Sequence, residues 1–286
     1  MKPPPFGYLA PTTVDDAVAA LHDAAGTGKV LAGGQSLLQD LRWRRVHPTV
    51  LVDIGGIDEL AGISVTAKEV RIGARVRHRD LEHPEAVPGP LGTLLARAAS
   101  HVAHPPVRSR GTIVGSLAWA HPASEWCGIA AGLGGRVELA STRGRRTVPV
   151  AEFLVGPGST TCDADELVTA LLLPRLPDSV RVAFREQRRT HASFAQVAVA
   201  VAVEKDDDGT VTRADIGLSG AAPTAVRAET AGGELCGTCG GPDDRAHAAA
   251  AAARDDADPV GEPHAGVAYR RNLVDVLLRR VLEEVA

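Results

Sequence analysis

The apolar positions of the first third of the chain change spacing several times. Those of 11–28 fall on one face of a predicted helix, with Thr12 or Thr13 as its N-cap. A β-type apolar run then ends in two glycines, and we expect a helix over 36–45 and a second strand over 50–54. This order predicts a β-α-β unit.

The middle of the chain is predicted to mix hairpins with helices. Alternating apolar and polar positions indicate two hairpins, and a purely apolar run stopped by proline indicates a further strand. The predicted elements are strands 63–65, 69–73, 136–140, 145–148 and 166–173 and helices 76–83, 90–101 and 124–133, the last capped by Ser124.

The last third holds three strand-like runs followed by helical patterns. Strands are expected over 181–187, 195–204 and 210–218, and helices over 224–235, 243–255 and 266–285. This order predicts a small α+β domain with helices on one face of an antiparallel sheet. We place the candidate domain boundary at 174–179.

Two stretches carry candidate chemistry. Val30 to Leu37 is a strand that ends in Gly33-Gly34 and opens into a helix, which brings backbone N–H groups to one place and can wrap a phosphate. An ordinary tight turn remains the alternative, and the stretch lacks the G-x-G-x-x-G dinucleotide fingerprint. The second stretch, 104–126, holds no single period, so we expect a functional loop or a loosely packed connection.

Composition excludes several classes of protein. The net charge of −4 gives no basic imbalance of the kind that nucleic-acid binding needs. No apolar run reaches the length of a membrane span, and no signal-peptide pattern is found, so we expect a cytoplasmic protein. Four cysteines in 286 residues do not form a disulfide framework. Cys236 and Cys239 form a lone CxxC motif, a weak sign of a redox pair or half a zinc site.

With both stretches in view, the chain resembles the FAD-binding medium subunit of the molybdenum hydroxylases, the family of carbon monoxide dehydrogenase and the bacterial xanthine dehydrogenases. The likeness covers almost the whole length. It is carried by Leu31–Leu37, Val52-Asp53-Ile54, Arg110–Ala118 with Pro122 and Glu125, Phe184-Arg185 and Ile216-Gly217-Leu218.

The resemblance implies an α+β protein in three parts. Two N-terminal α/β subdomains of a vanillyl-alcohol-oxidase-like flavin fold, about 1–56 and 57–176, form an FAD-binding domain over 1–176. A C-terminal domain of antiparallel strands and helices follows over 177–286.

The same resemblance implies a set of cofactor-binding residues and no catalytic residue. The first motif, Val30 to Leu37, would wrap the FAD pyrophosphate, and the second motif, Thr112 to Ser116, would contact the cofactor through small residues and backbone. Glu125 stands where the family has an aspartate, and Arg185 where it has a cation near the flavin. The full set is Val30, Leu31, Ala32, Gly33, Gly34, Gln35, Ser36, Leu37, Val102, Thr112, Ile113, Val114, Gly115, Ser116, Glu125, Val168 and Arg185.

Three departures from the family pattern stand out. Val114 replaces a glycine and disfavours the positive φ that a glycine turn would use, and Ser116 replaces an asparagine. Ser193-Phe194 keeps the aromatic residue of a family pair but loses its carboxylate. His121 is either a flavin-site proton donor or an ordinary loop histidine. It forms no metal-ligand pattern with His101 and His104, so we expect no metal.

The implied function is electron transfer in a heteromeric complex. The chain would bind FAD non-covalently, receive electrons from a [2Fe–2S] small subunit and pass them to NAD or a quinone, while a large subunit with the molybdenum cofactor oxidises the substrate. Two alternatives stay open: a scaffold or partner-binding member of the family without FAD, and a stand-alone flavin oxidoreductase.

Overall fold

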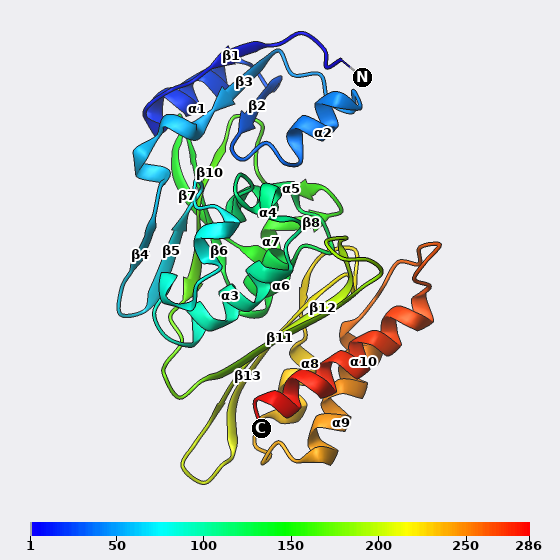
Figure 1. Cartoon of the computed structure of the whole chain (residues 1–286). Helices are drawn as coiled ribbons and strands as arrows, with labels where there is room; N and C mark the ends of the chain where they lie inside the picture. Colours follow the sequence, from blue (N-terminus) through cyan, green and yellow to red (C-terminus); the bar gives the residue numbers. More distant parts are fainter. Residues whose placement is uncertain (1) are drawn as a thin grey trace.

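The computed structural model describes residues 2–286 and contains three main sheets. The first is a small parallel sheet in the order β1–β3–β2, covered by the helix α1 (Figure 1). Its elements are β1 (Gly7–Leu9), α1 (Val14–Asp23), β2 (Gly28–Leu31), α2 (Leu37–Arg42) and β3 (Val50–Asp53). The β-α-β prediction is confirmed, and Thr13 caps α1 by accepting from the Asp16 N–H.

The second sheet is antiparallel, in the order β4–β5–β10–β6–β7. Its strands are β4 (Ile63–Val65), β5 (Glu69–Gly73), β6 (Arg136–Ser141), β7 (Gly144–Pro149) and β10 (Leu167–Pro174). Around it lie the 3-10 turns 54–56, 58–60, 78–81 and 84–86, and α3 (Pro90–His101), α4 (Pro105–Arg108), α5 (Ile113–Trp119), α6 (Glu125–Gly132), α7 (Val150–Phe153), β8 (Leu154–Gly156) and β9 (Ser159–Thr160).

Several local predictions for this region are wrong. The helix expected over 76–83 is only the 3-10 turn 78–81. The stretch 104–126 is not a loop, since it contains α4 and α5. Ser124 occupies the N-cap position of α6, but its side chain makes no capping hydrogen bond, and its hydroxyl oxygen is buried without a partner within residues 2–286.

The third sheet has the order β11–β12–β13–β14 and carries helices on one face, as predicted (Figure 1). Its elements are β11 (Arg181–Arg188), β12 (Ala195–Lys205), β13 (Val211–Ser219), β14 (Val226–Arg227), α8 (Glu229–Leu235), α9 (Pro242–Ala251), a π-helical turn (Ala252–Asp256) and α10 (Val267–Glu284). The helix expected over 224–235 begins only at 229, because β14 occupies its start.

Strand β12 shows how the two faces of this sheet are used. Its odd-numbered valines, 197 to 203, belong to the core under α8–α10, whereas its even-numbered alanines, 198 to 202, belong to the core shared with the N-terminal part. Small residues on the second face let α6 approach closely: a Cβ on Gly132 would lie 2.5 Å from the Gly217 Cα. The contact between α6 and β13 therefore depends on paired glycines.

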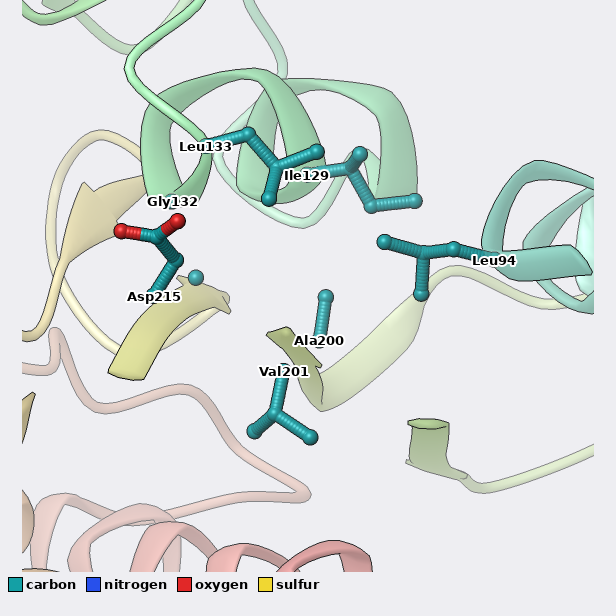
Figure 2. A pocket seen from close by; sticks show the side chains of 8 residues that line it. Leu94, Ile129, Gly132, Leu133, Ala200, Val201 and Asp215 are labelled. Atoms are coloured by element: carbon teal, nitrogen blue, oxygen red, sulfur yellow. The ribbon is translucent and has the colours of Figure 1, made fainter. Parts of the chain in front are cut away.

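The interface between these parts is closely packed. Figure 2 shows Leu94 of α3 and Ile129 of α6 facing Ala200 of β12. The gap between them leaves no room for a water molecule, and its one charged side chain, Asp215, is bonded by Arg213 and Arg227. This contact is therefore structural and not a ligand pocket. Within residues 2–286, no helix is both long and apolar enough to cross a bilayer.

Candidate functional site

The first glycine motif joins β2 to α2 in a half-buried segment. Gly34 has φ +73°, a backbone conformation that glycine adopts without strain. Within residues 2–286, the N–H groups of Gly33 to Ser36 donate to no backbone or side-chain acceptor. Successive free N–H groups form a concavity that favours an anion such as a phosphate. The segment therefore has the backbone chemistry that the sequence predicted.

Gly33 of the first motif packs against the backbone that leads into the second motif. A Cβ added there would lie 2.2 Å from the Arg110 carbonyl oxygen and 2.6 Å from the Gly111 Cα. Both are backbone atoms, which cannot move aside as a flexible side chain can. Gly33 is therefore required for the contact between the first motif and the segment that leads into the second.

A buried histidine, His78, holds the Gly111 backbone that Gly33 contacts. The backbone N–H of His78 donates to the Gly111 carbonyl at 3.0 Å, and its Nδ1 accepts from Trp126 Nε1 at 3.0 Å. Burial lowers the pKa of His78 to about 4, and the Arg108 charge adds to the effect. The ring is therefore neutral at pH 7. It packs directly against Gly111, where an added Cβ would lie 2.7 Å from His78 Nε2. Sequence reasoning missed His78, because no local pattern marks it.

The second motif is the first part of helix α5. Thr112 is its N-cap and accepts from the Gly115 N–H at 3.0 Å, so the motif is a capped helix start and not an open turn. Val114 lies inside the helix, is buried and has no positive φ. The chain therefore passes through this point without the positive φ that Val114 disfavours. Ser116 is half-buried and donates to the Thr112 carbonyl at 3.4 Å.

Two valines predicted to line the site are buried in the core of the N-terminal part. Val102 follows α3, and its carbonyl accepts from Arg108 at 3.0 Å. Val168 belongs to β10, on which α5 packs. Both side chains belong to the core cluster that also contains Ile113 and Val114.

Glu125 is the first residue of α6 and is only 5% exposed. Burial raises its pKa to about 8, and the nearby Glu186 carboxylate raises it further, while Arg188 opposes the shift. The carboxyl group is therefore mostly protonated at pH 7. Its helix is tied to the second motif, since Cys127 Sγ contacts the Ser116 carbonyl at 3.8 Å.

Arg185 does not lie with the other predicted cofactor-binding residues. Along β11, Phe184 and Glu186 face the N-terminal part, so Arg185 points to the opposite face and pairs with Glu284 at the end of α10. The alternation along β11 therefore separates Arg185 from the other predicted cofactor-binding residues. Arg188 is the β11 cation on the inner face, and it donates to the His101 carbonyl at 2.9 Å.

His121 lies in an aromatic stack. Its ring is 5.0 Å from the Trp119 ring and 4.0 Å from the Phe194 ring, measured between centroids. Burial lowers its pKa, although Glu262 acts in the opposite direction. The stack joins the end of α5 to the loop between β11 and β12. His121 is thus a packed residue between the two parts of the chain, and its protonation role stays open.

The candidate metal ligands and the CxxC cysteines do not form a site in the part of the chain that the structure describes. Within residues 2–286, no three histidine, cysteine or acidic side chains come together as metal ligands. Cys236 and Cys239 are both exposed free thiols in the loop between α8 and α9.

Two family models cover nearly the whole chain. Residues 4–176 match the FAD binding domain in molybdopterin dehydrogenase, and residues 182–285 match the CO dehydrogenase flavoprotein C-terminal domain. These matches place an FAD-binding unit over both glycine motifs.

Full-length relatives agree with these matches. The chain is 36% identical to the 6-hydroxypseudooxynicotine dehydrogenase complex subunit alpha of Paenarthrobacter nicotinovorans, over 99% of this chain and 95% of the relative. It is 33% identical to the carbon monoxide dehydrogenase medium chain of Hydrogenophaga pseudoflava, over 99% and 97%.

Solved structures show the same architecture. A chain of the carbon monoxide dehydrogenase from Hydrogenophaga pseudoflava superposes with a TM-score of 0.93 at 33% identity, covering 100% of this chain and 98% of that one. A chain of the reconstituted CO dehydrogenase from Oligotropha carboxidovorans gives a TM-score of 0.95 at 30% identity, covering 100% and 99%.

Proposed function

The chain belongs to the FAD-binding medium subunits of the molybdenum hydroxylases, and from this premise we propose that it carries electrons between an iron–sulfur subunit and NAD or a quinone. The proposed partners are a [2Fe–2S] small subunit and a large subunit that holds the molybdenum cofactor. Two relatives support such an assembly, because their names describe them as a medium subunit and a medium chain. We also propose a cytoplasmic location, which four free thiols support.

The residues of this chain fit FAD. Gly33 to Ser36 present free N–H groups to an anion, and the absence of a side chain at Gly33 allows the two motifs to touch. Thr112 fixes the start of α5, and His78 holds the Gly111 backbone. We propose that the segment Val30–Leu37 binds the pyrophosphate and that Thr112–Ser116 contacts the rest of the cofactor.

The protein groups supply binding and electrostatics. Bound FAD supplies the redox chemistry, accepting and releasing electrons one or two at a time. Substrate oxidation belongs, in this proposal, to the large subunit, so this chain needs no catalytic acid or base for it. Residues 1–176 and 177–286 are proposed as the FAD-binding and C-terminal domains, which the spans of the two family models support.

The contact at Gly33 is the observation that carries the proposal, because it brings the first motif against Arg110 and Gly111, the backbone that leads directly into the second motif. The acceptor is tested by mixing the dithionite-reduced, FAD-loaded chain anaerobically with NAD⁺ or with a soluble naphthoquinone. Return of the oxidised flavin absorbance with one of them is expected. Failure of both to reoxidise the flavin faster than buffer contradicts the proposed acceptors.

The partners are tested separately. The tagged chain is expressed with the genes encoded beside it, and the purified material is analysed for molybdenum, iron and acid-labile sulfide. Recovery of a large molybdenum subunit and a small iron–sulfur subunit is expected. Recovery of the FAD-loaded chain alone, with rapid reoxidation by dioxygen, contradicts the complex and supports a stand-alone oxidase.

A further inference from the structure

A buried carboxylate from the C-terminal part lies without hydrogen bonds in the neighbourhood of Glu125, a predicted FAD-binding residue. The side chain of Glu186, in β11, is 1% exposed. Neither of its oxygens has a hydrogen-bond partner within residues 2–286. A buried carboxylate that lacks donors is costly, so each such group calls for an explanation.

The neighbours of Glu186 offset its charge but do not satisfy its oxygens. Arg188 Nε lies 3.3 Å and His101 Nδ1 lies 3.4 Å from Oε1. Neither contact has hydrogen-bond geometry, and Arg188 directs its own donors to the His101 carbonyl and ring. Oε2 has no hydrogen-bond partner within residues 2–286 either. The carboxylate is thus held in place with acceptor capacity left over.

The position of Glu186 links it to the FAD site. His101 directly precedes Val102, which was predicted to line the site. Across the interface stands Glu125, whose helix contacts the second motif at Ser116. The two carboxyl groups are near enough to interact electrostatically, yet no hydrogen bond joins them. Two carboxyl groups, one from α6 and one from β11, therefore lie near each other at the interface between the two domains.

We infer that Glu125 and Glu186, here called the carboxyl pair, bind hydroxyl groups of FAD, with Glu186 as a cofactor-binding residue supplied by the C-terminal domain. This inference rests on FAD binding and not on the identity of the electron acceptor. Strand β11 of the C-terminal domain would then contact the cofactor directly, through Glu186.

The chemistry of the pair selects hydroxyl donors. The carbonyl oxygen of the protonated Glu125 and both oxygens of the Glu186 carboxylate accept hydrogen bonds, so they match hydroxyl groups, and the charge of Glu186 repels phosphates. FAD offers such donors on its ribityl chain and on its adenosine ribose. Both sources share one chemistry, and the cofactor fragments distinguish them, since ADP contains the ribose but no ribityl chain.

The test compares Glu186→Gln with wild type in the full chain after removal of FAD. Titration with FAD, followed by quenching of flavin fluorescence, gives Kd, and titration with ADP by calorimetry gives a second Kd. Loss of hydrogen bonds to a charged acceptor predicts a rise in the FAD Kd of roughly 10- to 100-fold. An ADP Kd that is unchanged assigns the contact to the ribityl chain, and one that rises equally assigns it to the ribose.

A structural role would give another result. If Glu186 only stabilises the interface, Glu186→Gln lowers the Tm of the FAD-free chain and leaves the FAD Kd within twofold of wild type, and the inference is overturned. The matched control is Glu284→Gln, which removes a carboxylate paired with Arg185 and with Arg97 and should leave the FAD Kd unchanged. Should Glu186→Gln fail to fold, Glu186→Asp carries the same comparison, because it retains the charge and withdraws the carboxylate by one methylene.

Discussion

Replacing Gly33 with alanine should separate the two motifs of the FAD site. The added Cβ would lie 2.2 Å from the Arg110 carbonyl oxygen, whereas ordinary contacts begin at 3.4 Å. The backbones must therefore move apart by about 1.2 Å, the difference between these two distances. Overpacking of this kind costs about 1–3 kcal/mol of stability.

The larger effect is expected on cofactor binding. The free N–H groups of Gly33 to Ser36 would lose their alignment with the pyrophosphate. Each hydrogen bond to a charged group contributes about 1.5–3 kcal/mol, so losing one or two costs about 1.5–6 kcal/mol. That corresponds to a rise in the FAD Kd of about 10-fold to about 10,000-fold.

The assay is fluorescence titration of the FAD-free variant, with circular dichroism as the check on folding. Gly156→Ala is the matched control, because a Cβ there would have its nearest neighbour at 3.8 Å and the residue has no positive φ. A folded Gly33→Ala variant that binds FAD within twofold of wild type would refute the assigned role of the first motif.

Three further predictions concern charge. The pKa of Glu125 is about 8 in the folded chain and near 4.5 in the unfolded chain, so the free energy of unfolding of wild type falls by on the order of 4 kcal/mol as pH rises between these values. Glu125→Gln should therefore raise Tm more at pH 8 than at pH 4, and an equal gain would contradict this. His78, with pKa about 4 when folded against 6.5, costs stability as pH falls through that window, on the order of 3 kcal/mol; urea unfolding at pH 6.5 and 4.5 should show a smaller loss for His78→Gln than for wild type. Arg185→Ala should leave the FAD Kd unchanged, since Arg185 pairs with Glu284 on the far face, and a tenfold rise would disprove that separation.

Periodicity predicted most elements of the fold because the elements are regular. The clearest case is β12, where valines and alanines alternate and each set enters a different core. The stretch 104–126 was misjudged for the opposite reason. Its helices α4 and α5 are four and seven residues long, too short for a helical period to emerge.

The site was predictable in its parts but not in its assembly. Each glycine motif is local, whereas the contact of Gly33 with Arg110 and Gly111 joins distant segments and leaves no sign in either. Strand parity separates two neighbours: the resemblance selected Arg185, which pairs with Glu284, whereas Glu186 faces His101 in the N-terminal part.

The flavin content of the purified chain tests the central claim most directly. The FAD-free chain is mixed with excess FAD, freed of unbound cofactor by gel filtration, and its visible flavin absorbance is compared with the protein concentration. The account predicts one FAD per chain, released into the supernatant when the protein is denatured. A colourless chain that retains no FAD after this treatment would contradict it.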